Sequence, residues 1–397
     1  MITHLLPVQQ ADPLAGYLAH QSEIDTAIAR VLSSGYYLLG DETRAFEAEF
    51  AHFVGSDQGV AVANGTDALR LALQACGVGQ VTGDQVIGDH EVIGDREVIG
   101  DHEVIAPSFT ATATIAAICQ SGARPVFADI DLDTYTLDPR HVQAAITPRT
   151  KAIVAVHLYG HPAPLAKLQA IATQHGLLLI EDCAQAHGAT WLGQPVGSVG
   201  IAAAFSFYPT KNLGALGDAG MIVTHDAHAA EQARLLRMYG WRQRYVSDIE
   251  GWNSRMDELQ AAVLRVKLRH LPAENARRQD IARYYLEQLA DLPIGLPVTL
   301  AECTHVYHQF VIRSAERDAL AAALKQQQIA TAIHYPVPVH LQPAYARHVR
   351  APLPASEQAA REVLSLPAYP QLTDAHVEHV AAAVRRFFKQ SHGVVGG

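Results

Sequence analysis

The stretch that indicates the fold most directly is AAAFSFYPTKNLGALGDAGMIVT, residues 202–224. Residues 202–207 and 220–224, at its two ends, are apolar runs with the length of a buried β-strand. Between them lies a glycine-rich turn that carries one lysine, Lys211. Because the strands are continuously apolar, we expect them to belong to a sheet that is covered on both faces.

The same pattern extends on both sides of this stretch. Further strands are predicted at residues 59–63, 104–106, 125–129, 152–157 and 177–182, and helices at residues 67–76, 111–121 and 165–175. Apolar strands that alternate with helices predict an α/β fold with a mostly parallel central sheet. A helix over residues 256–269, a strand over 306–313 and a helix over 318–327 predict a C-terminal α+β section. We therefore expect a large domain, residues 1–255, and a smaller one, residues 256–397.

One segment does not fit this alternation. Residues 86–105 read VIGDHE-VIGDRE-VIGDHE-VI, a six-residue unit in tandem. So few copies cannot build the stacked coils of a solenoid. We interpret residues 82–99 as an insertion that the fold tolerates, because a long surface loop adds little closure entropy. The alternative is a loop that binds a partner.

The composition excludes several classes of protein. The 397 residues include 30 Lys+Arg and 40 Asp+Glu, a formal net charge of −10, which disfavours a nucleic-acid partner. No apolar run approaches the roughly 18 residues that cross a bilayer, so no membrane partner is expected. The four cysteines form no CxxC pair, and the 21 histidines show no HxH or HExxH spacing. We expect a cytoplasmic protein with reduced thiols and no metal site.

Two features at the ends of predicted strands suit an anionic, heterocyclic ligand. Asn64-Gly65-Thr66 joins a strand to a helix, where unpaired N–H groups can bind a phosphate, although such a turn can also serve only as a helix cap. Asp182 ends a strand at the edge where open α/β sheets bind ligands, and its carboxylate could pair with a heterocyclic N–H. The alternative for Asp182 is an ordinary helix cap. Gln185 and His187 follow closely and either contact the same ligand or lie on the surface of the turn.

Lys211 carries the sharpest chemical indication. A lysine held near buried surface loses hydration, which lowers the pKa of its amine and makes it a nucleophile that can form a Schiff base. Ser206, five residues earlier, could reach a phosphate. An exposed lysine is the usual alternative, but it would not need the surrounding glycines, serine and aromatic residues.

These motifs resemble the DegT/DnrJ/EryC1/StrS family of sugar aminotransferases, which have the fold-type I aminotransferase architecture. The likeness spans residues 20–388. It is carried by SFYPTKNLGALGDAG together with SSGYYLLGDETRAFEAEFA, VANGTDALRLAL, GARPVFADIDLDTYTLDP, AIVAVHLYGHPAPL, LIEDCAQAHGA, GWNSRMDELQAAVLRVKL, VYHQFVIR, HYPVPVHLQPAY and LSLPAYPQLT.

The resemblance implies a cofactor, pyridoxal 5′-phosphate, with the pyridoxamine 5′-phosphate form as an intermediate. Lys211 would bind the cofactor covalently and later transfer a proton, and Asp182 would pair with the ring nitrogen. The other implied cofactor contacts are Gln185 near the 3′ oxygen, and Gly65, Thr66 and Ser206 at the phosphate, joined by Asn253 from the second subunit of a homodimer. The active site would then be shared across the dimer interface.

One position departs from the family pattern. Many relatives have an aromatic residue that stacks on the cofactor ring where this chain has Ala111. We expect Phe109, two residues earlier, to supply the ring face instead.

The resemblance also predicts the substrates. Tyr208, Arg244, His334, Tyr335 and His340 are the expected substrate contacts. The predicted reaction is a ping-pong transamination in which L-glutamate is the amino donor and a dTDP-linked 3-keto-6-deoxyhexose is the acceptor, within deoxyaminosugar biosynthesis for a lipopolysaccharide or other glycan. Amination at C-4 is the alternative. A non-catalytic regulator with the same fold is a second alternative, although it should have lost the lysine or the aspartate.

Overall fold

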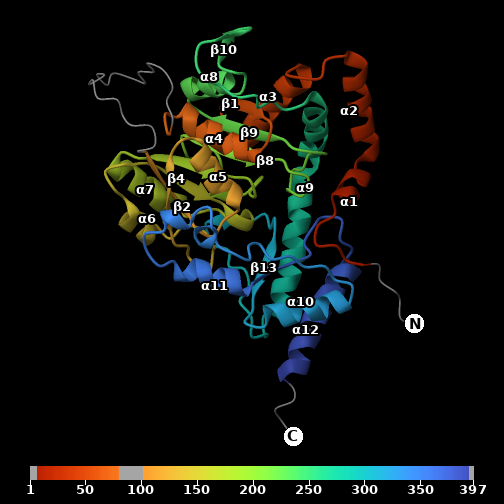
Figure 1. Cartoon of the computed structure of the whole chain (residues 1–397). Helices are drawn as coiled ribbons and strands as arrows, with labels where there is room; N and C mark the ends of the chain where they lie inside the picture. Colours follow the sequence, from red (N-terminus) through yellow and green to blue (C-terminus); the bar gives the residue numbers. More distant parts are fainter. Residues whose placement is uncertain (1–6, 80–101, 393–397) are drawn as a thin grey trace.

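The structure, a computed structural model, describes residues 7–79 and 102–392, with side chains as far as residue 390 (Figure 1). The predicted insertion at residues 82–99 lies outside the described residues. In the part that is described, no helix has the length and apolar character to cross a membrane.

A seven-stranded sheet forms the centre of the larger part of the molecule (Figure 1). All of its strands run in one direction except β9, which is antiparallel to both of its neighbours, β1 and β8. Across the sheet the order is β1 (Gln58–Val62), β9 (Gly220–Thr224), β8 (Ala202–Ser206), β5 (Leu178–Asp182), β4 (Thr150–Val156), β2 (Glu103–Pro107), β3 (Arg124–Ala128). The predicted mostly parallel sheet is confirmed, and each predicted strand in it agrees with the observed bounds within two residues.

The middle of each strand is apolar because the strand buries both of its faces. In β4, Ala152, Val154 and Val156 belong to the core on one side of the sheet, and Ile153 and Ala155 belong to the core on the other side. Side chains alternate along a strand, so a strand between two layers of helices needs an apolar residue at every position. This is the physical basis of the continuous apolar runs in the sequence.

Helices cover both faces of this sheet. The first core contains residues of α4 (Gly65–Ala75), α5 (Thr112–Gln120), α8 (Ala227–Leu236) and α11 (Pro354–Glu362). The second core contains residues of α3 (Asp41–Val54), α6 (Pro139–Ala145), α7 (Leu165–His175) and the first half of α9 (Glu258–Leu289). The two layers make the sheet a buried scaffold, which holds the ends of its strands in fixed positions.

The C-terminal section is built around the second half of α9. A separate core joins this half of α9 to β13 (Phe310–Arg313), β14 (Val363–Leu366), α10 (Arg317–Gln326) and α12 (Asp374–His392). The predicted helix at residues 256–269 is too short, because α9 continues through Pro272 to Leu289. The predicted strand at 306–313 is too long, because only its last four residues pair with β14. The division into domains at residue 255 stays a prediction, since α9 contributes both to the second core of the sheet and to the C-terminal core.

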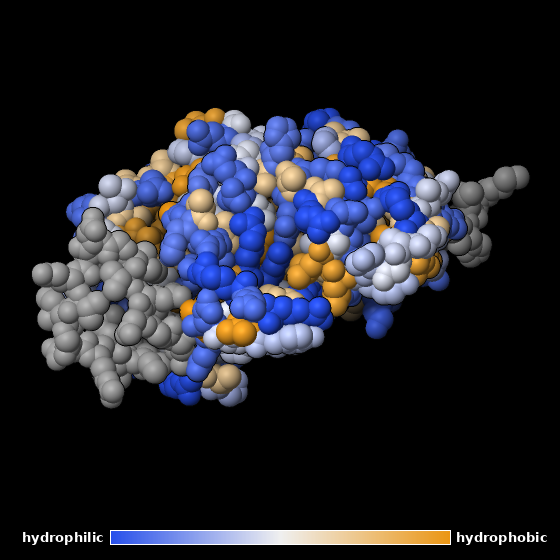
Figure 2. All heavy atoms as spheres, turned by 90° about the horizontal axis from the view of Figure 1, so that it is seen from above, coloured by the Kyte–Doolittle hydropathy of each residue, from blue (hydrophilic) through white to orange (hydrophobic). Residues whose placement is uncertain are grey.

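Shorter elements complete the described chain. They are α1 (Pro13–Leu18), α2 (Gln21–Ser34), η1 (Leu158–Gly160), β6 (Thr190–Trp191), β7 (Gln194–Pro195), β10 (Trp241–Gln243), β11 (Val246–Ser247), β12 (Cys303–Thr304), η2 (Val339–Leu341) and η3 (Ala346–His348). The face seen from above in Figure 2 is largely hydrophilic, and its hydrophobic side chains lie in small separate groups.

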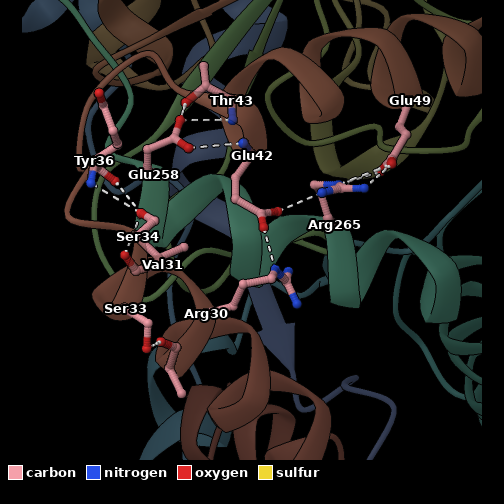
Figure 3. Close-up of polar contacts among 11 residues, drawn as sticks. Arg30, Val31, Ser33, Ser34, Tyr36, Glu42, Thr43, Glu49, Glu258 and Arg265 are labelled. Carbon is pink, nitrogen blue, oxygen red and sulfur yellow. Dashed lines mark hydrogen bonds and ion pairs between the residues drawn. The ribbon is translucent and has the colours of Figure 1, made fainter.

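A buried carboxylate at the start of α9 holds the N-terminal helices in place (Figure 3). Glu258 accepts hydrogen bonds from the backbone N–H groups of Gly40, Glu42 and Thr43 and from the Thr43 hydroxyl. These are N–H groups at the first turn of α3, which has no side-chain cap of its own. Arg265, further along α9, adds ion pairs to Glu42 and Glu49. The contacts fix the N-terminal helices against α9.

Candidate active site

A cavity of about 250 Å³ lies at the carboxyl edge of the sheet. This is the edge where the parallel strands β4, β5 and β8 end and where the turn before α4 begins. The cavity is lined by Asn64, Gly65, Thr66, Leu69, Thr110, Ala111, Ala113, Thr114, Val156, His157, Leu158, Asp182, Ala184, Gln185, Ser206, Tyr208, Lys211 and Asp218. Seven of the residues predicted from the sequence are therefore brought together: Gly65, Thr66, Asp182, Gln185, Ser206, Tyr208 and Lys211.

One end of the cavity is a cradle for an anion. Asn64 caps α4, and its side chain accepts a hydrogen bond from the N–H of Asp67, so Gly65 and Thr66 occupy the first helical positions. The N–H groups of these positions have no partner within the helix, and the positive end of the helix dipole lies beside them. A Cβ on Gly65 would lie 2.4 Å from the Cβ of Ser206, so only glycine lets the backbone approach that serine.

Asp182 is one of the two acidic residues that line the cavity, and Asp218 is the other. Its Oδ2 accepts a hydrogen bond of 2.8 Å from the Thr114 hydroxyl, and its Oδ1 accepts one of 3.1 Å from the N–H of Ala184. The side chain is thus fixed from two sides, while it still borders the cavity. Glu181, its neighbour, points to the opposite side of the sheet and accepts hydrogen bonds from His157 Nε2 and the N–H of Gly197. Strand alternation therefore assigns only Asp182 to the cavity.

Lys211 is the amine that lines the cavity. Burial lowers the pKa of its amine to about 8, although the nearby charge of Asp182 acts in the opposite direction. A lysine with this pKa is partly neutral near pH 8 and can attack a carbonyl carbon. The prediction of a desolvated lysine amine therefore agrees with its surroundings in the fold.

Gln185 connects the cavity to the C-terminal section. Its Oε1 accepts a hydrogen bond of 2.7 Å from the N–H of Tyr159, and its Nε2 donates one of 3.0 Å to the hydroxyl of Tyr335. The Tyr159 hydroxyl donates to the carbonyl of His334. Burial, together with the charge of Lys211, lowers the pKa of His334 to about 4, so this imidazole is neutral at physiological pH. His334 and Tyr335 thus lie next to the cavity without lining it.

Two other predicted residues are buried elsewhere. Phe109 is fully buried in the core, with its ring 6.2 Å from that of Tyr135, and Ala111 borders the cavity in its place. We therefore do not assign the ring face of the cofactor to Phe109. His340 is also buried, where its Nδ1 lies 3.0 Å from the Ser108 hydroxyl. The structure gives His340 no contact with the cavity.

Two further predicted residues lie outside the cavity and are exposed. Arg244 lies between β10 and β11, a hairpin at the top of Figure 1, and its guanidinium lies 4.8 Å from the ring centre of Tyr245. Asn253 forms a β-bridge with Met238. Neither reaches the cavity of its own chain.

Sequence reasoning missed two residues that shape the site. Thr114 orients Asp182, and His157 lines the cavity while it bonds Glu181. Nothing local marks Thr114 among the threonines of its helix, because its partner lies 68 residues away. His187, considered as a ligand contact, instead packs against the rings of Phe205 and Phe207, and burial lowers its pKa to about 3.

The three groups of the cavity fit pyridoxal 5′-phosphate. The cradle at Gly65, which has no room for a Cβ, suits the phosphate, and Asp182 suits a protonated pyridine nitrogen. The amine of Lys211 suits the aldehyde.

The comparisons with known proteins agree with this chemistry. The model of the DegT/DnrJ/EryC1/StrS aminotransferase family matches residues 19–90 and 93–385. The chain is 50% identical over 377 residues to the erythromycin biosynthesis sensory transduction protein EryC1 of Saccharopolyspora erythraea, covering 94% of this chain and 98% of the relative. It is 48% identical over 379 residues to the dTDP-3-amino-3,4,6-trideoxy-alpha-D-glucose transaminase of Streptomyces venezuelae, covering 95% of each.

A solved structure shows the same fold. The crystal structure of S. venezuelae DesV in complex with a ketimine intermediate has a TM-score of 0.90 and 47% sequence identity to this chain, and the match covers 97% of this chain and 99% of DesV. The predicted fold-type I architecture is thereby confirmed.

Proposed function

The chain belongs to the DegT/DnrJ/EryC1/StrS aminotransferase family, whose members depend on pyridoxal phosphate, and on that basis we propose its substrates and the role of each residue. We propose that it transfers an amino group from L-glutamate to the 3-keto group of a dTDP-linked 6-deoxyhexose. The observation that carries this proposal is that Lys211 and Asp182 line one cavity together with the anion cradle at Gly65.

In this proposal the chain holds the cofactor by its two ends. The N–H groups of Gly65 and Thr66 and the hydroxyl of Ser206 bind the phosphate. The carboxylate of Asp182 pairs with the ring nitrogen, and Thr114 keeps that carboxylate in place through its 2.8 Å hydrogen bond. When bound, the cofactor supplies an electron sink, which stabilises negative charge at the substrate carbon.

Lys211 then acts as a base and as an acid. Its amine would hold the cofactor covalently and, when free, would take the proton from the substrate carbon and later return it. A pKa of about 8 suits both steps, because the same amine must accept and return a proton near neutral pH. Tyr208, which lines the cavity and is largely exposed, is placed to contact the sugar.

The acceptor is proposed from the relatives. The printed name of the S. venezuelae relative assigns it a dTDP-3-amino sugar, and its 48% identity extends over 95% of this chain. Incubation of the purified enzyme with L-glutamate and either the 3-keto or the 4-keto dTDP-sugar tests this choice. We expect an amino sugar, detected by mass spectrometry, only from the 3-keto compound. Turnover of the 4-keto sugar alone would refute the proposed position.

The donor half-reaction is tested separately. Addition of L-glutamate alone to the holoenzyme should remove the visible absorption of the covalently bound cofactor. The same experiment distinguishes an enzyme from a regulator, a class suggested by the name of the S. erythraea relative. A protein that binds the cofactor but never responds to an amino donor would support the regulator.

We further propose that the active site is completed by a second copy of the chain. Exposed apolar side chains gather near the start of α9: Leu38 forms a bridge with Asp257, and Leu216 donates its N–H to Gln260. Tyr36, next to Leu38, is 75% exposed. Exposed apolar groups of this kind favour a protein interface.

Asn253 is exposed and does not line the cavity of its own chain, so it is available to the phosphate site of a partner. Mixing of two inactive variants, K211A and N253D, tests this arrangement. A shared site predicts that hybrid dimers recover activity, because one of their two sites has both native residues. A mixture as inactive as its components would contradict the shared site.

A further inference from the structure

Two histidines and two glutamates meet where the start of α2 lies against the middle of α9 (Figure 1). His20 precedes α2 and Glu23 lies in its first turn, whereas His270 and Glu274 are one turn apart on α9. None of the four lines the cavity at the carboxyl edge of the sheet. The cluster is therefore separate from the site already described.

The four side chains form two matched pairs. His20 Nε2 lies 3.0 Å from Glu274 Oε1, and His270 Nε2 lies 3.0 Å from Glu23 Oε1. The two imidazole rings are stacked, with centroids 3.9 Å apart and planes 14° from parallel. One donor atom each from His20, Glu23 and His270 lie within 4.8 Å of one another.

The separation between His270 Nε2 and Glu23 Oε1 is close to that between two ligand atoms of one coordinated ion. Ligand atoms at about 2.0–2.2 Å from a tetrahedral zinc are about 3.4 Å apart. The 3.0 Å separation between His270 Nε2 and Glu23 Oε1 is nearly the same, whereas the three ligand atoms together lie within 4.8 Å. Because the two imidazole rings are stacked, one of them must rotate before both nitrogens face the same ion. Imidazole and carboxylate are the ligands that Zn²⁺ and similar divalent ions take.

We propose that His20, Glu23 and His270 form a binding site for a divalent transition-metal ion such as Zn²⁺, with Glu274 as a fourth ligand or as the hydrogen-bond acceptor that orients His20. The ion would tie α2 to α9, the helix that contributes to the second core of the sheet and to the C-terminal core. The site is independent of the proposed reaction, because it shares no residue with the catalytic cavity.

The charges around the cluster are compatible with an ion. Arg269 donates to Glu23 Oε2 at 2.7 Å, which leaves Oε1 directed at His270. Gln371, a neutral residue, is the other partner of Glu274.

A second cluster of residue types that can bind a metal, His157, Glu181 and Cys183, has no free oxygen on its glutamate. Glu181, near His157 and Cys183, accepts hydrogen bonds from His157 and from the N–H groups of Gly197, Val199 and Gly200. Glu181 is fully buried, so an ion there would break a complete hydrogen-bond network inside the core, whereas the side chain of Glu23 is 46% exposed and water can replace its partners. The comparison favours the cluster at His20.

The test is calorimetric titration of chelator-treated holoenzyme with zinc chloride. We expect saturable binding of one ion per chain. Loss of even an outer partner of a metal ligand weakens binding by about 10–100-fold, so H270Q and H20Q should each lose at least about tenfold in affinity.

H225Q is the matched control. His225 forms an exposed pair with Asp57 at 2.9 Å and belongs to neither group of possible metal ligands, so its loss should leave zinc binding unchanged. Cofactor absorption shows that each variant is folded and that zinc does not act at Lys211. The proposal fails if wild-type protein shows no saturable binding at submillimolar zinc. It also fails if H20Q and H270Q, with normal cofactor spectra, bind zinc like the wild type.

Discussion

Substitution of Gly65 by alanine is the sharpest test of the phosphate cradle. A Cβ at this position would lie 2.4 Å from the Cβ of Ser206 and 2.9 Å from its Oγ. Carbon atoms in contact prefer about 3.5–4.0 Å, so the chain must move by roughly 1 Å to accept one methyl group. Overpacking of this kind costs about 1–3 kcal/mol.

The direction in which the substitution changes the stability of the fold is what makes the test informative. In an open helical position, replacement of glycine by alanine stabilises a protein by up to about 1 kcal/mol. G16A supplies this control, because Gly16 lies in α1 with no atom within 4 Å of the added Cβ. G65A should therefore lower the melting temperature, whereas G16A should leave it unchanged or raise it.

The cofactor measurement separates local from general damage. Movement of Gly65 away from Ser206 removes one or two hydrogen bonds to the phosphate, each worth about 1.5–3 kcal/mol because the phosphate is charged. Titration of the apo-protein should then show pyridoxal phosphate binding at least about tenfold more weakly to G65A. Pyridoxal, which has no phosphate, should bind to both proteins alike. Equal losses for both ligands, or no loss for either, would refute the cradle.

Three further outcomes are expected. Covalent attachment of pyridoxal phosphate, followed by absorbance, should speed up as pH rises and level off above about pH 8, because the Lys211 amine must be neutral to react; a midpoint near pH 10.5 would contradict its burial. In E258Q, one oxygen that accepts N–H groups of α3 becomes an NH₂ group, which should destabilise the fold by about 1–3 kcal/mol in thermal unfolding, whereas the exposed E231Q should have almost no effect. Burial alone would raise the pKa of Glu103, but hydrogen bonds from its arginine partners lower it to about 2, so this carboxylate stabilises the fold above pH 4.5 and ceases to do so as pH falls toward 2. E103Q should accordingly lose up to about 3 kcal/mol of unfolding free energy at pH 7, and less than this where solvent screens its half-exposed arginine partners. In acid-unfolding curves the difference in unfolding free energy between E103Q and the wild type should disappear as the pH falls. A difference that does not depend on pH would contradict this.

The sequence by itself determined the sheet and the three chemical groups of the site. Residues 202–205 and 221–223 are apolar at every position because both faces of these strands are buried, so successive residues along each strand must be apolar. Gly65, Asp182 and Lys211 each follow or end a predicted strand, and the structure brings all three to one cavity at the carboxyl edge of the sheet.

Only the tertiary structure decided which side chains support these groups. Thr114 reaches Asp182 across 68 residues, and Phe109 lies in the core instead of at the cavity, although both follow the same strand. The meeting of His20 with His270 likewise depends on how α2 packs against α9. Local patterns report which face of an element is buried, but a contact between distant side chains depends on the register and packing of whole elements, and no short stretch of sequence contains that information.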